Sequence, residues 1–200
     1  MSEFNNPVFS VILAGGLSRR MQGQDKGLLK VNNRSLIEFG IECISHQVDK
    51  ILISANRNIP QYNKLGYPVL TDTFGEYAGP LAGILTALEN IPEDSLLLVL
   101  PCDMPTLPHD LVAALKNQLM TEEADLCCVL QQQRLQPLVS IMHHRVQENL
   151  QQYLHKGQHK VQDWVQGLNF CTLPLTNESL FNINSPEDLI QFEEQAAHGK

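Results

Sequence analysis

Two short stretches of this chain contain residue types that bind phosphate and divalent cations. The first has Gly15-Gly16 directly after the apolar run 11–14 and continues with Arg19, Arg20 and Lys26. Glycine has no Cβ atom, so successive backbone N–H groups can turn toward an anion there. The three cationic side chains add positive charge to the same loop. The stretch predicts a phosphate-binding loop at the end of a buried strand; the alternative is an ordinary surface turn.

The second stretch is Pro101-Cys102-Asp103-Met104-Pro105, which directly follows the leucine-rich run 95–100. An acid between two prolines at the end of a buried strand is rigidly presented. Because Mg²⁺ needs only one or two carboxylates and otherwise uses phosphate and water oxygens, this single acid is sufficient for a metal site. The alternative is that Asp103 caps the helix expected near Pro108.

Neither of two common phosphate motifs matches the glycine-rich loop. The Walker A motif requires lysine and then serine or threonine directly after its last glycine, whereas Gly23 is followed by Gln24-Asp25-Lys26. The dinucleotide fingerprint Gly-x-Gly-x-x-Gly is broken by Gly15-Gly16-Leu17. The glycine-rich loop therefore fits neither the P-loop motif nor the dinucleotide-binding motif.

Composition limits the class of protein further. The chain has 200 residues with 14 basic and 22 acidic side chains, a net charge of −8, which argues against a general nucleic-acid or membrane-surface binder. The five cysteines are an odd number without Cys-x-x-Cys spacing, as expected for reduced thiols. There is no signal-like N-terminus and no apolar run of membrane length. We expect a cytoplasmic protein.

The elements that must position these residues alternate between strand and helix through the first 120 residues. This order predicts one α/β domain of three layers with a mainly parallel, Rossmann-like sheet covered on both faces. Ser35 and Glu38 form a capping box at one helix start. Strands are expected at 11–14, 50–55, 69–70, 95–100, 126–130, 138–142 and 170–173, with a short strand and turn over 30–34, and helices at 35–47, 60–65, 80–89, 108–119, 144–155, 160–166 and from 185 onward.

Polar residues follow four of these strands, at Gly15-Gly16, 54–57, Asp72 and Asp103. In such sheets, ligands bind beyond the carboxyl ends of the strands, so we expect these positions to surround one ligand. Taken alone, Asp72 could equally cap the loop that follows it.

The glycine-rich loop resembles the signature of the molybdenum cofactor guanylyltransferases, Leu-Ala-Gly-Gly-x-x-x-Arg-Met-Gly-x-Asp-Lys. Gln22 departs from it where many members have glycine. Three further segments resemble family motifs in the same order, and the likeness covers nearly the whole chain. The matching positions are Leu13 to Gly16, Arg20, Met21, Asp25, Lys26, Gly79 to Gly83, Pro101 to Pro105 and Asn182 to Pro186.

The resemblance implies a nucleotidyltransferase of the glycosyltransferase-A-like fold that joins GMP from GTP to molybdopterin with Mg²⁺ as cofactor. It implies that Lys26 contacts the transferred phosphate, Arg20 the leaving pyrophosphate, and Asp103 the metal. Asn182 and Asn184 would face the acceptor, although turn and cap chemistry before the last helix explains them equally well. The implied nucleotide contacts are Leu13, Ala14, Gly15, Gly16, Lys26, Ser54, Asp72, Gly83 and Asp103.

The resemblance further implies one domain over 1–200, with a nucleotide-binding part at about 8–120 and an acceptor-side part at about 121–196. Its protein partners would be molybdoenzyme apo-proteins or cofactor-synthesis proteins. Two alternatives stay open. One is a cytidylyl- or sugar-phosphate nucleotidyltransferase of the same fold, and the other is a non-catalytic GTP-binding partner that passes the cofactor on.

Overall fold

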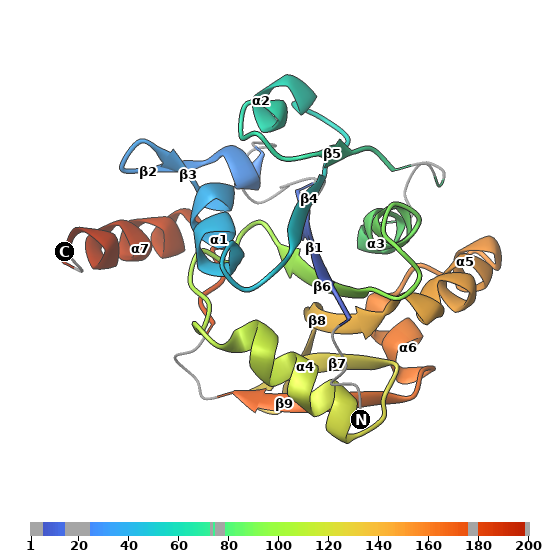
Figure 1. Ribbon diagram of the computed structural model, residues 1–200. Helices are drawn as coiled ribbons and strands as arrows, with labels where there is room; N and C mark the ends of the chain where they lie inside the picture. Colours follow the sequence, from blue (N-terminus) through green and yellow to red (C-terminus); the bar gives the residue numbers. More distant parts are fainter. Residues whose placement is uncertain (1–5, 15–24, 73, 75–78, 176–179, 199–200) are drawn as a thin grey trace.

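The computed structural model describes residues 6–14, 25–72, 74, 79–175 and 180–198. Between residues 34 and 121 its strands and helices alternate, as predicted for the first 120 residues (Figure 1). The strands are β1 (Val8–Leu13), β2 (Lys30–Val31), β3 (Arg34–Ser35), β4 (Lys50–Ser54), β5 (Val69–Leu70), β6 (Leu96–Pro101), β7 (Leu126–Gln131), β8 (Arg134–His143) and β9 (Phe170–Leu175). The helices are α1 (Leu36–Ile44), α2 (Ile59–Asn63), α3 (Pro80–Leu88), α4 (Leu111–Thr121), α5 (Gln147–His155), α6 (Val161–Gln166) and α7 (Pro186–His198), with 3₁₀ turns at Lys26–Leu28 and His144–Val146.

The main sheet has the strand order β5-β4-β1-β6-β8-β7-β9, and β8 is its antiparallel member among the described residues. The mainly parallel sheet is therefore confirmed. The sequence predicted that this strand starts at residue 138, but β8 begins at Arg134. The reason is a tight hairpin in which Gln132 and Gln133 both have positive φ, so that pairing with β7 resumes at once. No glycine or asparagine signals that turn.

Helices cover both faces of the sheet, which makes three layers (Figure 1). α1, α2 and α4 pack on one face and α3, α5 and α6 on the other. Neighbouring residues of a strand alternate between these two cores, as Cys127 and Cys128 do. Both faces are thus apolar, which explains why the strands read as continuous hydrophobic runs.

A small third core holds α7 against the strand pair β2–β3 and the start of α1 (Figure 1). Its buried members are Val31, Leu36, Ile183 and Phe192. The predicted capping box at the start of α1 is confirmed, with the Ser35 N–H donating to Glu38 over 2.7 Å. Two predicted helix ends are wrong, since α1 stops at Ile44 and α4 starts at Leu111, after a turn in which Leu111 N–H donates to the Pro108 carbonyl.

The carboxyl ends of β1, β4 and β6 lie side by side at one edge of the sheet. Leu13 is paired with Ser54 in β4 and with Pro101 in β6. Beyond the strand, Ala14 N–H donates to the Ser54 carbonyl at 2.8 Å and Cys102 N–H to the Leu13 carbonyl at 3.1 Å. Residues that follow these strands are therefore brought together.

None of the helices in the described part of the chain is both long enough and apolar enough to span a lipid bilayer.

Replacing Gly83 with alanine tests how closely α3 packs on the sheet. A Cβ atom there would clash with the Ser54 hydroxyl and lie 3.0 Å from Leu13 Cδ2. We expect Gly83→Ala to lower the free energy of unfolding by about 1–3 kcal/mol, measured by urea denaturation. Gly40→Ala in α1 is the matched control, because its Cβ would meet only the Met104 carbonyl at 3.6 Å. Equal losses in the two variants would contradict this account.

Candidate functional site

The Lys26 ammonium group connects three segments beyond the carboxyl end of β6. It donates to Asp103 Oδ2 at 2.9 Å and to Asn184 Oδ1 at 3.0 Å. The Lys26 and Asp103 side chains are only 20% and 14% exposed, so water screens their attraction incompletely. The structure therefore brings Asn184, one of the two predicted asparagines, together with Lys26 and Asp103; Asn182 and Asn184 are both exposed residues.

Asp103 has one carboxylate oxygen left over. Its Oδ1 atom is buried and has no hydrogen-bond partner among the described residues. Leaving a buried acceptor unpaired costs free energy, and a hard cation is the type of ligand that satisfies such an oxygen. The described residues contain no cluster of three or more His, Cys, Asp or Glu that could hold a metal by themselves. A divalent ion on Asp103 would therefore share its coordination with substrate and water oxygens, and Asp103 fits that requirement.

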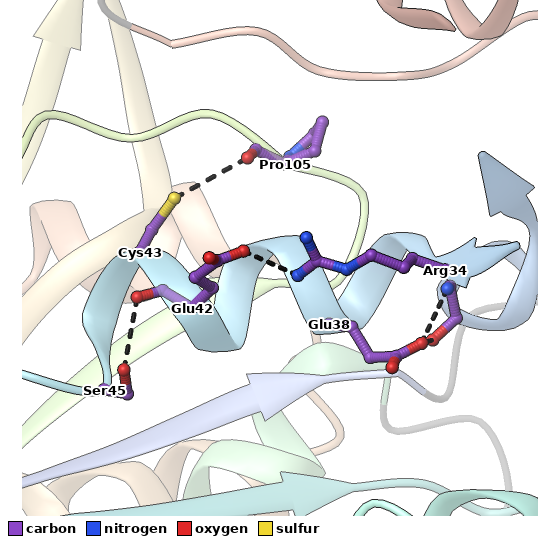
Figure 2. Close-up of polar contacts among 7 residues, drawn as sticks. Arg34, Glu38, Glu42, Cys43, Ser45 and Pro105 are labelled. Atoms are coloured by element: carbon purple, nitrogen blue, oxygen red, sulfur yellow. Dashed lines mark hydrogen bonds and ion pairs between the residues drawn. The ribbon is translucent and has the colours of Figure 1, made fainter. Parts of the chain in front are cut away.

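The loop that carries Asp103 is held from several sides. Ile183 N–H donates to the Asp103 carbonyl at 2.9 Å, and Thr106 forms a β-bridge with Phe181. On the α1 side, the Cys43 thiol points at the Pro105 carbonyl, with sulfur and oxygen 3.7 Å apart (Figure 2). These contacts support the rigid presentation that the two prolines predicted. The carboxylate of Asp103 pairs with Lys26 rather than capping α4.

A second polar cluster lies at the end of β4. Asn56 donates its side-chain amide to Asp72 Oδ2 at 2.7 Å and accepts the Asp72 N–H at 2.9 Å. The Ser54 hydroxyl donates to Asp72 Oδ1 at 3.3 Å. Ser54 and Asp72, both predicted site residues, are thus adjacent. Asn56 lies in the range 54–57 that was expected to face the ligand, and its paired donor and acceptor are what orient Asp72.

The sequence provided no indication of the surroundings of Asp25, the residue before Lys26. Its carboxylate is buried. It accepts from the Tyr62 hydroxyl at 2.6 Å and the Asn58 amide at 3.0 Å, and lies 3.5 Å from Arg57 Nε. Burial raises the pKa of Tyr62 far above its usual range, and the bond to Asp25 adds to the shift. Tyr62 therefore stays a neutral donor. The only feature of the sequence that pointed to Asp25 was its place directly before Lys26 in the loop.

Three further predicted nucleotide contacts lie close to Ser54. Leu13 and Ala14 end β1 beside Ser54, and Gly83 faces Ser54 and Leu13 from α3. Gly15, Gly16 and Arg20 lie outside the described residues. The described part of the predicted site thus gathers at one sheet edge, in two clusters around Asp72 and Asp103.

The sequence comparisons with known proteins agree on one family. Residues 10–170 match the MobA-like NTP transferase domain. A molybdenum cofactor guanylyltransferase of Shewanella halifaxensis is 40% identical over 195 residues, which is 96% of this chain and 97% of that protein.

Two solved structures show the same fold. Molybdopterin-guanine dinucleotide biosynthesis protein A from Archaeoglobus fulgidus has a TM-score of 0.75 at 23% identity, covering 94% of this chain and 98% of that one. A Mycobacterium tuberculosis protein crystallised with manganese has a TM-score of 0.67 at 12% identity, covering 94% and 99%.

Asp188, in the first turn of α7, holds the segment that carries Asn184. Its carboxylate accepts from the backbone N–H groups of Asn184 at 2.8 Å and Ser185 at 2.9 Å, and its own N–H donates to the Ser185 hydroxyl at 3.2 Å. The bond from Asn184 is the main reason that the pKa of Asp188 lies below its usual value. The ionised carboxylate thereby stabilises the fold.

The pH dependence of stability tests this cap. Because the folded-state pKa of Asp188 is lowered, its contribution is fully present above the unfolded-state pKa and is lost as pH falls through the folded-state pKa. We expect Asp188→Asn to lower the free energy of unfolding by about 1 kcal/mol at pH 7, and the difference from wild type to shrink as the pH falls through the folded-state pKa of Asp188. Thermal unfolding over a pH series measures it. Glu187→Gln in the same turn is the control, and an equal effect there would exclude the cap.

Proposed function

The chain belongs to the family of MobA-like NTP transferases, and we propose that it transfers GMP from GTP to the terminal phosphate of molybdenum-loaded molybdopterin, releasing pyrophosphate. The 40% identity to a guanylyltransferase over nearly the full chain supports these substrates. The observation that carries the chemistry is the contact between Lys26 and Asp103, whose second oxygen is buried without a partner.

The reaction needs alignment and charge neutralisation more than proton transfer. A terminal phosphate oxygen of molybdopterin attacks the α-phosphorus of GTP, and the bond from that phosphorus to the bridging oxygen breaks. The nucleophile is already an anion, so no strong general base is required. Two polyanions must, however, be held together, which calls for fixed positive charge at the reacting phosphate.

Each side chain at the site has a role in this scheme. Lys26 exchanges its bond to Asp103 for the transferred phosphate, while the amides of Gly15-Gly16 and the Arg20 guanidinium bind the leaving pyrophosphate. Asp103 would hold Mg²⁺ through its unpartnered oxygen, and the ion would supply positive charge to the phosphate oxygens. Asn184 faces the acceptor, and Asn182 lies two residues before it.

The nucleoside end of GTP is assigned to the second cluster. The Asp72 carboxylate accepts from Asn56 and Ser54 and still has lone pairs for donors on the nucleotide. Leu13 and Ala14 end β1 at the same sheet edge, and Gly83 of α3 packs against Leu13 and Ser54 there. In this proposal the nucleotide binds to the part at about 8–120 and the acceptor to the part at about 121–196.

Replacing Lys26 with alanine tests whether its ammonium group serves catalysis more than it serves the stability of the fold. We expect Lys26→Ala to lower kcat/KM by about 10²–10³, because a charge on the reacting phosphate is lost, while unfolding free energy changes by about 1–2 kcal/mol. Pyrophosphate release and urea denaturation measure the two quantities. Lys64→Ala, an exposed lysine just after α2, is the control. Full activity of Lys26→Ala would refute the assignment.

The choice of nucleotide and metal tests the reaction itself. With molybdopterin and Mg²⁺, we expect pyrophosphate release from GTP to exceed that from CTP by about 10²-fold or more, because the cluster around Asp72 is proposed to select guanine. Chelation by EDTA should stop release, and adding back Mg²⁺ should restore it. Preference for CTP would indicate a cytidylyltransferase. GTP binding without any pyrophosphate release would indicate a non-catalytic carrier.

A further inference from the structure

Asp25 is a buried carboxylate to which the proposed reaction gives no task. Its side chain is 4% exposed, and its three partners come from a single segment, Arg57 to Tyr62, which includes the start of α2. Burying a carboxylate is costly unless donors satisfy it, and here they do. The arrangement ties the residue before Lys26 firmly to α2.

The residue after Lys26 is equally restricted. A Cβ atom on Gly27 would lie 2.6 Å from the Tyr62 hydroxyl and 3.3 Å from Cys102 Sγ, so the backbone at 27 is packed between α2 and the end of β6. Tyr62 thus touches both neighbours of Lys26, one by a hydrogen bond and one by packing.

The backbone of Lys26 itself belongs to a short 3₁₀ turn. Leu28 N–H donates to the Asp25 carbonyl and Leu29 N–H to the Lys26 carbonyl, both at 3.1 Å. Lysine has a flexible four-carbon stem, so the position of its ammonium group depends on where the turn holds its Cα atom. At the other end of that stem, Nζ reaches Asp103 and Asn184.

We propose that Asp25 is a positioning residue: through its hydrogen bonds to Tyr62 and Asn58 it fixes the Lys26–Leu28 turn, so that the Lys26 ammonium group stays at the transferred phosphate. This inference rests on the proposed role of Lys26. A shift of about 1 Å in a catalytic group can cost about 10²-fold in rate, so loosening the turn should affect turnover before it affects folding.

The test compares Asp25→Asn with wild type in the full chain. Asparagine keeps the shape but presents an N–H₂ group where the carboxylate accepted, so one donor, from Tyr62 or Asn58, loses its acceptor. We expect kcat to fall about tenfold while KM for GTP stays within about twofold. Deuterium exchange of segment 25–29 should speed up, and exchange of the central sheet should not.

A double-mutant cycle gives the readout that a merely structural role would not produce. In a Lys26→Ala background, Asp25→Asn should cause no further loss of activity, because the group it positions is already absent. Independent, multiplying losses would overturn the proposal. Tyr62→Phe, which removes a single hydroxyl, provides the second variant if Asp25→Asn folds poorly, and the same non-additivity is expected.

Trp164→Phe is the matched control for lost stability. It removes the 2.9 Å bond from the buried indole N–H to Asn149, on the face of the sheet opposite to α2. We expect this variant to keep wild-type kcat. Equal loss of kcat in Trp164→Phe and Asp25→Asn would overturn the proposal, as would unchanged exchange at 25–29. If wild type itself releases no pyrophosphate, the proposed function fails, whereas the exchange data still decide whether Asp25 holds the turn.

Discussion

The hydrogen bonds of the Lys26 ammonium group to Asp103 and Asn184 are the contacts on which the candidate site depends. They join positions 77 and 158 residues away along the chain. Each of the three segments is anchored separately, by the Asp25 network, by the loop between Pro101 and Pro105, and by the cap of α7. The Lys26–Asp103 pair is mostly shielded from water, so the attraction between the two charges is weakly screened. The same two charges would interact strongly with a phosphate and a metal ion.

Most of the fold follows from patterns visible in the sequence. Strand–helix alternation predicted the parallel sheet, and a shared edge for parallel strands predicted that Ser54, Asp72 and Asp103 would gather. The antiparallel β8 was located but its start was misjudged, because the tight turn at Gln132 and Gln133 carries none of the usual turn residues. Such a turn is stabilised by the pairing of the strands around it rather than by local preference.

Candidate site residues could be predicted where they lie in a distinctive local sequence motif. Lys26 and Asp103 each lie in a distinctive local motif, and they do meet. The hydrogen bonds of Asp25 were not predicted, because its partners lie on another segment: Asp25 and Tyr62 are 37 positions apart. Asn184 was half recognised, since a cap and a ligand look alike in sequence and the segment serves as both a backbone cap and a contact of Lys26.

The position of β1 in the sheet has a consequence for how the molecule acquires its structure. β1 comes first among the strands, yet its two partners are the segments around 50 and 96, so its central place can be occupied only after long loops have closed. Loop-closure entropy makes such non-local parallel pairing slow compared with hairpin or helix formation. Both apolar faces of β1 therefore stay uncovered early in folding, and this interval is when self-association competes most strongly with the native route.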